Sequence, residues 1–503
     1  MVLAGAVVLR VLAMLAFRPV MWFGGDSASY LATGLRLIPD PSRVGGYAFM
    51  LWVLRPLHSL ALVAAVQHLM GLAMGTLIYL LARRYGLPAW GATLAAVPVL
   101  FDAYELQLEH DIVPDIPFGF LVLVALYLML RSPGERRPAK PAGGLGPAAA
   151  GGKASRVVPP GASTAAAAAF LLGVSAIIWP VGLALLAVLL AALLIRRASL
   201  VAVAAALLAG ALPVAAYAAW FGLHEHQFSL TRSDGVFLWS RTMSFADCAV
   251  IKPPADEAIL CPPGGPRIAS SLYIWDGNSP LLRMPGGRFS ARTNALALNF
   301  ALRAIAAQPG GYIAAVAHDF ALSFYWDRPL HPDAGIVDRY QFSDAATAWV
   351  PATMRTPGGG TVAGDQAAYN GGRPAPTRAV QPFASWLVSY QRWAYLRGTL
   401  LGVILLGTLA VMIARRRARG AALPWAFAVT ILLVPPAVAD FDLRYLVPAV
   451  PAACLAAALA CAPSESQRRW TMSPAATGTS APGEDRTSSL PSGSTPTAKP
   501  ESS

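Results

Sequence analysis

The sequence predicts an all-α polytopic membrane protein with about ten transmembrane helices and one loop domain on the outer face. Of the 503 residues, 56% are hydrophobic and only 13% are charged, and the mean hydropathy is +0.52. Apolar runs of about 20 residues, the length that crosses a bilayer as a helix, recur along the chain. Soluble domains carry about twice as many charged residues. The composition therefore excludes a soluble globular protein.

The first half of the chain is expected to form seven of these helices. The first, over about 2–22, carries Arg10, which is costly in lipid. Arg10 marks either a functional residue or a contact with a neighbouring helix, and the contact is favoured. No signal-peptide cleavage site follows, so this helix is expected to be retained. After an outer loop that ends in an amphipathic segment, the other helices are expected at about 58–82, 87–102, 112–130, 163–195 (two short helices that reverse at Pro180) and 198–221.

The second half contains a long segment, 222–384, that is less hydrophobic and rich in glycine, proline and aromatic residues. It is long enough for a small folded domain, and 295–326 is expected to be an amphipathic helix that breaks at Pro309. Three apolar helices follow, and the tail is rich in Ser, Thr, Pro and Gly and is expected to be disordered. The expected parts are a membrane module over 1–221, an outer domain over 222–384, helices at about 385–413, 422–439 and 443–462, and a tail over 463–503.

Basic residues set the expected orientation. Ten helices would bring the arginine clusters at 83–84, 131–137, 196–197 and 415–419 to one side, which the positive-inside rule makes cytoplasmic. Both termini and a Pro/Gly/Ala-rich linker over 131–160 would then be cytoplasmic. All but five of the 26 acidic residues fall on the outer side or near it, so we expect chemistry at the outer face. The net charge of +13 reflects cytoplasmic loops, because no basic–aromatic nucleic-acid motif is present.

The four cysteines fall into two pairs. Cys454 and Cys461 lie in the last helix and are expected to be buried thiols, whereas Cys248 and Cys261 lie in the outer segment. That compartment permits oxidation, so a disulfide between Cys248 and Cys261 is predicted. No zinc pattern, phosphate-binding loop, dinucleotide fingerprint or serine-hydrolase motif is present, and no dedicated metal site or cofactor is predicted.

Four short polar clusters converge on the predicted outer face. The first is Phe23-Gly24-Gly25-Asp26-Ser27-Ala28-Ser29-Tyr30, just beyond the first helix. A carboxylate beside an apolar wall could take the proton of an acceptor hydroxyl. In a helix, Asp26 would share one face with Ser29 and Tyr30. The alternative is that Asp26 only caps a helix that starts at Ser27.

Two further clusters each offer one arginine. Arg43, in Ser42-Arg43-Val44-Gly45-Gly46-Tyr47, could bind a lipid phosphate. The alternative is an ordinary arginine attracted to lipid head groups. Arg444, in Asp440-Phe441-Asp442-Leu443-Arg444-Tyr445, could neutralise a phosphate while Asp440 or Asp442 holds it. The alternative is a structural Arg–Asp pair.

The remaining cluster is an acidic hairpin between two predicted helices. It could bind acceptor hydroxyls or a divalent cation through oxygen ligands. The alternatives are that it only solubilises a short loop, and that its last acid only caps the next helix. Its polar residues are Asp102, Glu105, Glu109, His110, Asp111 and Asp115.

In this order, the clusters resemble the polytopic glycosyltransferases of the C superfamily, in the branch of the protein O-mannosyltransferases, the lipid A aminoarabinose transferase and their actinobacterial relatives. The resemblance covers about 1–220 and 295–460. Asp26-Ser27-Ala28-Ser29-Tyr30 is similar to the acidic motif of the family, although Ser27 replaces its second acid. Arg43-Val44-Gly45-Gly46-Tyr47 resembles the element that contacts donor phosphate but lacks its prolines. Arg444-Tyr445-Leu446-Val447-Pro448 resembles an Arg-Tyr-Leu-Leu-Pro element of bacterial members.

The resemblance implies a glycosyltransferase, using a hexosyl or pentosyl donor linked to polyprenyl phosphate, at the outer face of the plasma membrane. Its acceptor would be a hydroxyl of a glycan, a lipid or a protein, and membrane lipid would surround it. Asp26 would be the catalytic base, and Arg43 and Arg444 would hold the donor phosphate. The acid that the family has before its fourth helix falls on Asp115 or, less closely, Glu109. The other candidates for the donor or acceptor site are Tyr30, Tyr47, Glu105, His110, Asp111 and Tyr445.

Two other functions remain open at this point. A transporter or flippase for a lipid-linked sugar would need an inverted repeat and broken helices at mid-membrane, and neither is visible in the sequence. A non-catalytic protein of cell-envelope assembly would use 222–384, which carries no matched motif, as its binding module. In that case Asp26 would tolerate replacement by Asn.

Overall fold

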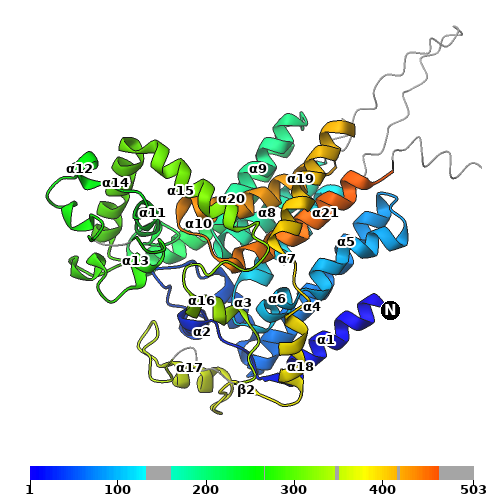
Figure 1. The fold of residues 1–503 in the computed structure, drawn as a ribbon, viewed down its shortest axis with the longest axis horizontal. Coiled ribbons are helices and arrows are strands. Elements are labelled where there is room, and N and C mark those ends of the chain that lie inside the picture. Colours follow the sequence, from blue (N-terminus) through cyan, green and yellow to red (C-terminus); the bar gives the residue numbers. More distant parts are fainter. Residues whose placement is uncertain (132–159, 265–266, 346–350, 416–419, 464–503) are drawn as a thin grey trace, which may run out of the picture. The chain divides into compact units, whose positions relative to one another are not determined.

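A computed structural model describes residues 1–131, 160–264, 267–345, 351–415 and 420–463 (Figure 1). Residues 1–462 form one compact unit. Within the described residues the fold is helical, apart from one antiparallel pair of two-residue strands, β1 (Phe17–Arg18) and β2 (Arg378–Ala379), and two isolated bridges. The linker over 132–159 and the tail from 464 lie outside the described residues.

Apolar helices occur at the predicted places along the described chain. Four are long and apolar enough to cross a membrane: α4 (Leu60–Arg84), α10 (Leu200–Glu225), α19 (Gly398–Arg415), and the run from Leu443 to Cys461 that joins η5 (Leu443–Ala449) to α21 (Val450–Cys461). Six are shorter: α1 (Val2–Ala16), α5 (Ala89–Phe101), α7 (Asp115–Leu130), α8 (Ala162–Ile178), α9 (Val181–Ile195) and α20 (Ala422–Val438). The predicted all-α polytopic membrane fold is therefore confirmed.

Local sequence accounts for several helix ends. Ser59 and Ser199 cap α4 and α10, because each hydroxyl accepts a hydrogen bond of 3.2 Å from the amide three residues later. The predicted reversal at Pro180 is confirmed, since α8 ends before Trp179 and α9 begins after Pro180. The predicted break at Pro309 is also confirmed, because α14 (Ala291–Ala307) ends there and α15 (Pro309–Leu322) begins.

Two predicted helices are wrong in extent. The first ends at Ala16 rather than near 22, because Phe17 and Arg18 leave the helix to pair with β2. The helix predicted over about 385–413 is two helices, α18 (Phe383–Gln391) and α19. Gly398, at the start of α19, lies against the backbone near Phe324, where an added Cβ would be 2.5 Å from the carbonyl oxygen of Ser323.

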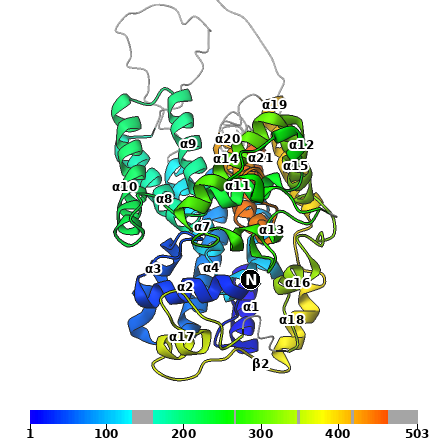
Figure 2. The same cartoon turned by 90° about the vertical axis from the view of Figure 1, so that its left-hand side faces the viewer.

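Residues 222–384 contribute two groups of short helices to the compact unit. The first comprises α11 (Asp234–Thr242), α12 (Cys248–Ile251), α13 (Leu272–Trp275) and α14, which enclose a small core that includes Trp239 and Phe300. The second includes α16 (Ala334–Val337) and α17 (Val362–Tyr369). In both views α17 lies beside α2 (Gly24–Arg36) (Figures 1 and 2). Asp365 of α17 forms an ion pair with Arg36 of α2.

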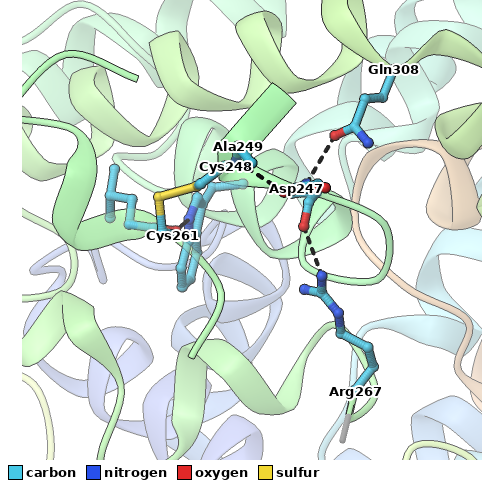
Figure 3. Close-up of a disulfide and its surroundings, with 9 residues drawn as sticks. Asp247, Cys248, Ala249, Cys261, Arg267 and Gln308 are labelled. Atoms are coloured by element: carbon cyan, nitrogen blue, oxygen red, sulfur yellow. Dashed lines mark hydrogen bonds between the residues drawn. A yellow bond between two sulfur atoms is a disulfide. The ribbon is translucent and has the colours of Figure 1, made fainter. Parts of the chain in front are cut away.

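A disulfide joins Cys248 and Cys261, the two cysteines singled out in the outer segment, with their Cα atoms 6.1 Å apart. Figure 3 shows it at the start of α12, which Asp247 caps by accepting a 2.9 Å hydrogen bond from the amide of Ala249. The Asp247 amide in turn donates to the side chain of Gln308. The bridge therefore closes a proline-rich loop onto the core of α11 and α14.

Replacing Cys248 and Cys261 by Ser is expected to weaken this outer core. A crosslink that closes a loop of about 15 residues is worth about 3 kcal/mol on the chain-entropy model. We expect hydrogen-exchange protection of α11 and α14 to fall by roughly that free energy in the full-length protein. Cys461→Ser is the matched control, because Cys461 is an exposed free thiol, so its predicted burial is wrong, whereas that of Cys454 is confirmed. Equal protection in both variants would show that the disulfide does not stabilise this core.

Candidate active site

Asp26 lies in the first turn of α2, which begins at Gly24 rather than at Ser27. Gly24 has a φ of 52°, a left-handed conformation that favours glycine. Phe23 is the N-cap, and no side chain makes a capping hydrogen bond. The alternative that Asp26 only caps a helix from Ser27 is therefore wrong. Instead, the Ser27 hydroxyl accepts a hydrogen bond from the Phe23 amide and donates to the carbonyl of Ile112, which fixes this end of α2.

Two arginines bind the Asp26 carboxylate, one on each oxygen. Nη1 of Arg43, from the loop before α3 (Gly46–Leu54), pairs with Oδ1. Nη1 of Arg444, from η5, lies 2.9 Å from Oδ2. The Asp26, Arg43 and Arg444 side chains are 24%, 18% and 14% exposed, so the cluster is partly accessible. Three residues predicted for one site are thus in contact, and their roles stay predictions.

The two guanidinium groups control the charge of Asp26. Burial raises the pKa of this carboxyl, but Arg43 and Arg444 outweigh burial and lower the pKa from 3.8 to about 2. Asp26 is therefore ionised at any physiological pH. While both arginines are bound to it, however, the carboxylate is a weak base.

A second carboxylate stands behind each arginine. Asp40 Oδ2 lies 3.8 Å from Nε of Arg43, and Asp40 also accepts hydrogen bonds from the Ser42 amide and hydroxyl at 2.7 and 2.6 Å. Asp442 Oδ2 lies 3.9 Å from Nε of Arg444. Of the two acids predicted to hold Arg444, the structure thus gives that contact to Asp442. Asp40 was missed, although an Asp two residues before a Ser is a turn signal that could have found it.

Aromatic rings flank Arg43. Its guanidinium carbon is 5.9 Å from the ring centre of Tyr30 and 6.0 Å from that of Trp275. Trp275 belongs to α13 and is 45% exposed, so the segment 222–384 reaches the rim of the site. Sequence reasoning missed Trp275, because no motif was found in that segment. Tyr47 packs edge-on against Tyr30, but its hydroxyl donates to the buried Gln67, away from Asp26.

Arg444 is enclosed in the same way by the rings of Phe23 and Tyr445, whose centres are 4.9 and 5.5 Å from its guanidinium carbon. Tyr445 also packs on Trp179, at the reversal between α8 and α9. The predicted residues Tyr30 and Tyr445 therefore line the arginine pair. Tyr47 packs against Tyr30 and does not contact the arginines directly.

The acidic hairpin divides into two groups, and Asp111 and Asp115 form the group on the Arg444 side. Their side chains are 1% and 4% exposed. Both Asp111 oxygens and one Asp115 oxygen lack a hydrogen-bond partner among the described residues. Burial raises the pKa of Asp111, Asp115 raises it further, and Arg444 opposes both. These oxygens could accept hydroxyl groups or hold a hard divalent cation.

Glu105, Glu109 and His110 lie on the other side, in a buried network. Glu109 forms a 2.6 Å ion pair with Arg10 of α1 and a 2.7 Å contact with His68 of α4. His110 contacts His68 at 3.0 Å and the carbonyl of Phe17 at 2.6 Å. Glu105 is buried next to them in α6 (Ala103–His110). These three predicted site residues are not brought to Asp26.

The network corrects two further expectations. The hairpin does not solubilise a loop, because the side chains of Glu105, Glu109 and Asp111 are at most 2% exposed. Asp102, proposed with the other hairpin residues to bind a hydroxyl or a cation, instead caps α6 by accepting hydrogen bonds from the amides of Tyr104 and Glu105. The favoured role of Arg10, contact with a neighbouring element, is confirmed.

No family model matches this chain, and no curated protein matches it. Among solved structures, ArnT from Cupriavidus metallidurans bound to undecaprenyl phosphate is 14% identical, with a TM-score of 0.34 over 91% of this chain and 76% of that chain. The archaeal oligosaccharyltransferase AglB from Archaeoglobus fulgidus, in complex with an inhibitory peptide and a dolichol-phosphate, is 13% identical, with a TM-score of 0.36 over 91% of this chain and 49% of that chain.

Asp440 joins three segments near the site. Its carboxylate accepts a 2.7 Å hydrogen bond from the amide of Ser271, just before α13, and lies 2.7 Å from Nε2 of His331. Asp319, His331 and Asp440 each offer one ligand atom. These three atoms lie within 4.8 Å of one another, a set that could hold a metal ion. Asp319 already forms an ion pair with the buried Arg241. Asp440 was one of the two acids predicted to hold Arg444, and it instead contacts Ser271 and His331.

The His331–Asp440 pair is expected to make stability depend on pH. Burial lowers the pKa of His331, but Asp440 outweighs burial and raises it above 6.5. For Asp440, burial raises the pKa, but His331 outweighs burial and lowers it below 3.8. The pair therefore stabilises the folded protein fully between about pH 4 and 6.5, and this stabilisation is lost as pH rises through the raised pKa of His331.

His331→Gln should flatten the fall in melting temperature above pH 6.5, whereas the exposed control His224→Gln should keep this fall. An unchanged fall in His331→Gln would exclude this pair as its cause.

Proposed function

We propose that the protein is a membrane glycosyltransferase that transfers a sugar from a polyprenyl-phosphate donor to an acceptor hydroxyl at the outer face of the plasma membrane. The observation that carries this proposal is the contact of Asp26 with both Arg43 and Arg444. One carboxylate and two guanidinium groups, beside the ends of apolar helices, are the charges that such a reaction needs. The motifs that hold these residues favour the C superfamily, in its branch of protein O-mannosyltransferases and aminoarabinose transferase.

In the proposed reaction, Asp26 takes the proton of the acceptor hydroxyl as its oxygen attacks the anomeric carbon of the sugar. The bond between that carbon and the phosphate oxygen breaks, and the electron pair stays on the lipid phosphate. The phosphate gains one negative charge in this step. Arg43 and Arg444 would stabilise that charge, and stabilisation of developing charge is a large contribution to catalysis.

Asp111 and Asp115 would face the sugar or the acceptor. Both Asp111 oxygens and one Asp115 oxygen have no hydrogen-bond partner within the described chain, and hydroxyl groups of a sugar could satisfy them. A divalent cation held there would instead supply a positive charge near the leaving phosphate. Trp275 at the rim offers an exposed aromatic face for an acceptor that approaches from the outer segment.

The site's expected side of the membrane follows from the arginine clusters. With ten spans and both termini cytoplasmic, α2 and η5 would lie at the outer face, where lipid-linked rather than nucleotide-linked sugars are available. The acceptor could be a glycan, a lipid or a protein of the cell envelope, and the donor a hexosyl or pentosyl lipid, of which a mannosyl lipid is one candidate.

The test uses membranes from cells that express the wild type, Asp26→Asn or the exposed control Asp256→Asn. Radiolabelled polyprenyl-phosphate hexoses and pentoses are supplied one at a time, and label is followed into lipid, glycan and protein fractions. Transfer by the wild type and the control, lost in Asp26→Asn at equal protein level, would support the proposal. Movement of labelled lipid across the membrane without transfer from any donor would favour a flippase instead.

A further inference from the structure

The arginines assigned to the donor phosphate are not free in the structure, because the proposed base is bound to both of them. We propose that Asp26 and the donor phosphate compete for Arg43 and Arg444, and that the donor must displace the Asp26 carboxylate before this carboxylate can act as a base. This inference rests on the proposed function and adds to it an order of events. The donor would bind first, and the acceptor would be activated only afterwards.

Competition follows from the chemistry of the contacts. A guanidinium group pairs with carboxylate and with phosphate through the same N–H groups. Arg43 uses Nη1 for one oxygen of Asp26, and Arg444 uses Nη1 for the other. A phosphate that bridges the two arginines would need the space that this carboxylate now takes and the N–H of Arg43 that is bound to it.

The arginines would stay in place when Asp26 leaves. Arg43 keeps Asp40, which is itself fixed by Ser42 and by the Ser29 hydroxyl. Arg444 keeps Asp442, which accepts a hydrogen bond from the hydroxyl of Tyr340. Each guanidinium would thus keep a carboxylate within 4 Å of its Nε, and both would stay available to a phosphate. Asp26 is the only acid with an ion pair to both arginines within the described residues.

Displacement would also make Asp26 a stronger base. While Asp26 is paired with the two guanidinium groups, they lower its pKa to about 2. Bound donor would remove both of these partners and bring a phosphate charge nearby, and each change favours uptake of a proton by Asp26. After transfer, the acceptor's proton is on Asp26 and passes to solvent. The ionised carboxylate can then return to the arginines and displace the lipid phosphate product.

The test measures binding of a probe that carries the phosphate without a sugar, a radiolabelled polyprenyl phosphate, to the full-length protein in nanodiscs. Asp26→Asn should bind it roughly 10-fold more tightly than the wild type, since a neutral amide competes less well than the carboxylate for the two charged guanidinium groups. Asp26→Ser should show the same gain, and it serves if Asp26→Asn does not fold. Arg43→Gln and Arg444→Gln should each weaken binding.

Asp115→Asn is the matched control for charge. It removes one negative charge that Arg444 also senses, but Asp115 has no ion pair with either arginine in the described chain. Its gain in affinity should be clearly smaller than that of Asp26→Asn. Binding that is equal to or weaker than wild type in both Asp26 variants, while the arginine variants bind weakly, would overturn the inference and leave the proposed function intact. No binding by the wild type, or full binding by the arginine variants, would overturn the proposed function itself.

Discussion

Asp26→Asn is expected to lower kcat for sugar transfer by about 10²- to 10⁴-fold, the range that a general base contributes. The amide has the shape of the carboxylate but cannot take the proton of the acceptor hydroxyl. The donor should remain bound, because Arg43 and Arg444 are unchanged and have lost a competitor. The measurement is the initial rate at saturating donor and acceptor, with purified protein in nanodiscs.

A comparison of kcat with the donor KM distinguishes loss of the base from damage to the phosphate site. A loss of the base lowers kcat without raising the donor KM, whereas a collapse of the phosphate site raises the donor KM. Arg444→Gln should show the second pattern and supplies the contrast. If Asp26→Asn keeps more than about a tenth of wild-type kcat, another group takes the proton and the proposed mechanism fails.

Arg10→Met is expected to destabilise the protein by about 3–5 kcal/mol, the usual cost of removing one partner of a buried ion pair. Glu109 would be left with no exposed surface and without its 2.6 Å contact to Arg10. The carbonyl of Leu100, which accepts a 2.6 Å hydrogen bond from Arg10, would lose this donor too. Reversible unfolding in mixed micelles, followed by tryptophan fluorescence, gives the free-energy difference.

Two variants check the cause. Arg10→Met combined with Glu109→Gln removes both charges and should recover a large part of the loss. Arg397→Met breaks a pair with Asp327, whose side chain is 85% exposed, and should cost less than about 1 kcal/mol. A double variant as unstable as Arg10→Met would assign the loss to packing rather than to the unpaired charge.

The helices were predictable because apolar runs of membrane length are a local property of the sequence. Their ends were less so, because long-range contacts decide them. The sequence near Phe17 does not predict that this segment pairs with Arg378 and Ala379, about 360 residues later, and that the pairing ends α1. Likewise, the break between α18 and α19 depends on Gly398 lying against a distant backbone segment.

The candidate site shows the same division. Asp26, Arg43 and Arg444 stand in short motifs, so they could be named from sequence, and the structure brings them into contact. The sequence could not show which acids of the hairpin lie near Arg444 and which lie in the buried network, because spacing along the chain does not reveal the charges that face them. Glu109 meets Arg10 and His68 from other helices, whereas Asp111 and Asp115 sense Arg444.

The ion pair between Arg10 and Glu109 has a consequence for biosynthesis, because its two residues are 99 positions apart. The segment that forms α1 leaves the ribosome long before Glu109 is made. An arginine at the centre of an inserting helix costs about 2.5–3.5 kcal/mol on translocon scales, and no counter-charge is present at that stage. The first helix is thus a weak membrane anchor while it is alone. Arg10 gains its partner Glu109 only after α4 and α6 have been synthesised. The final integration of α1 is therefore expected to occur later than its initial insertion.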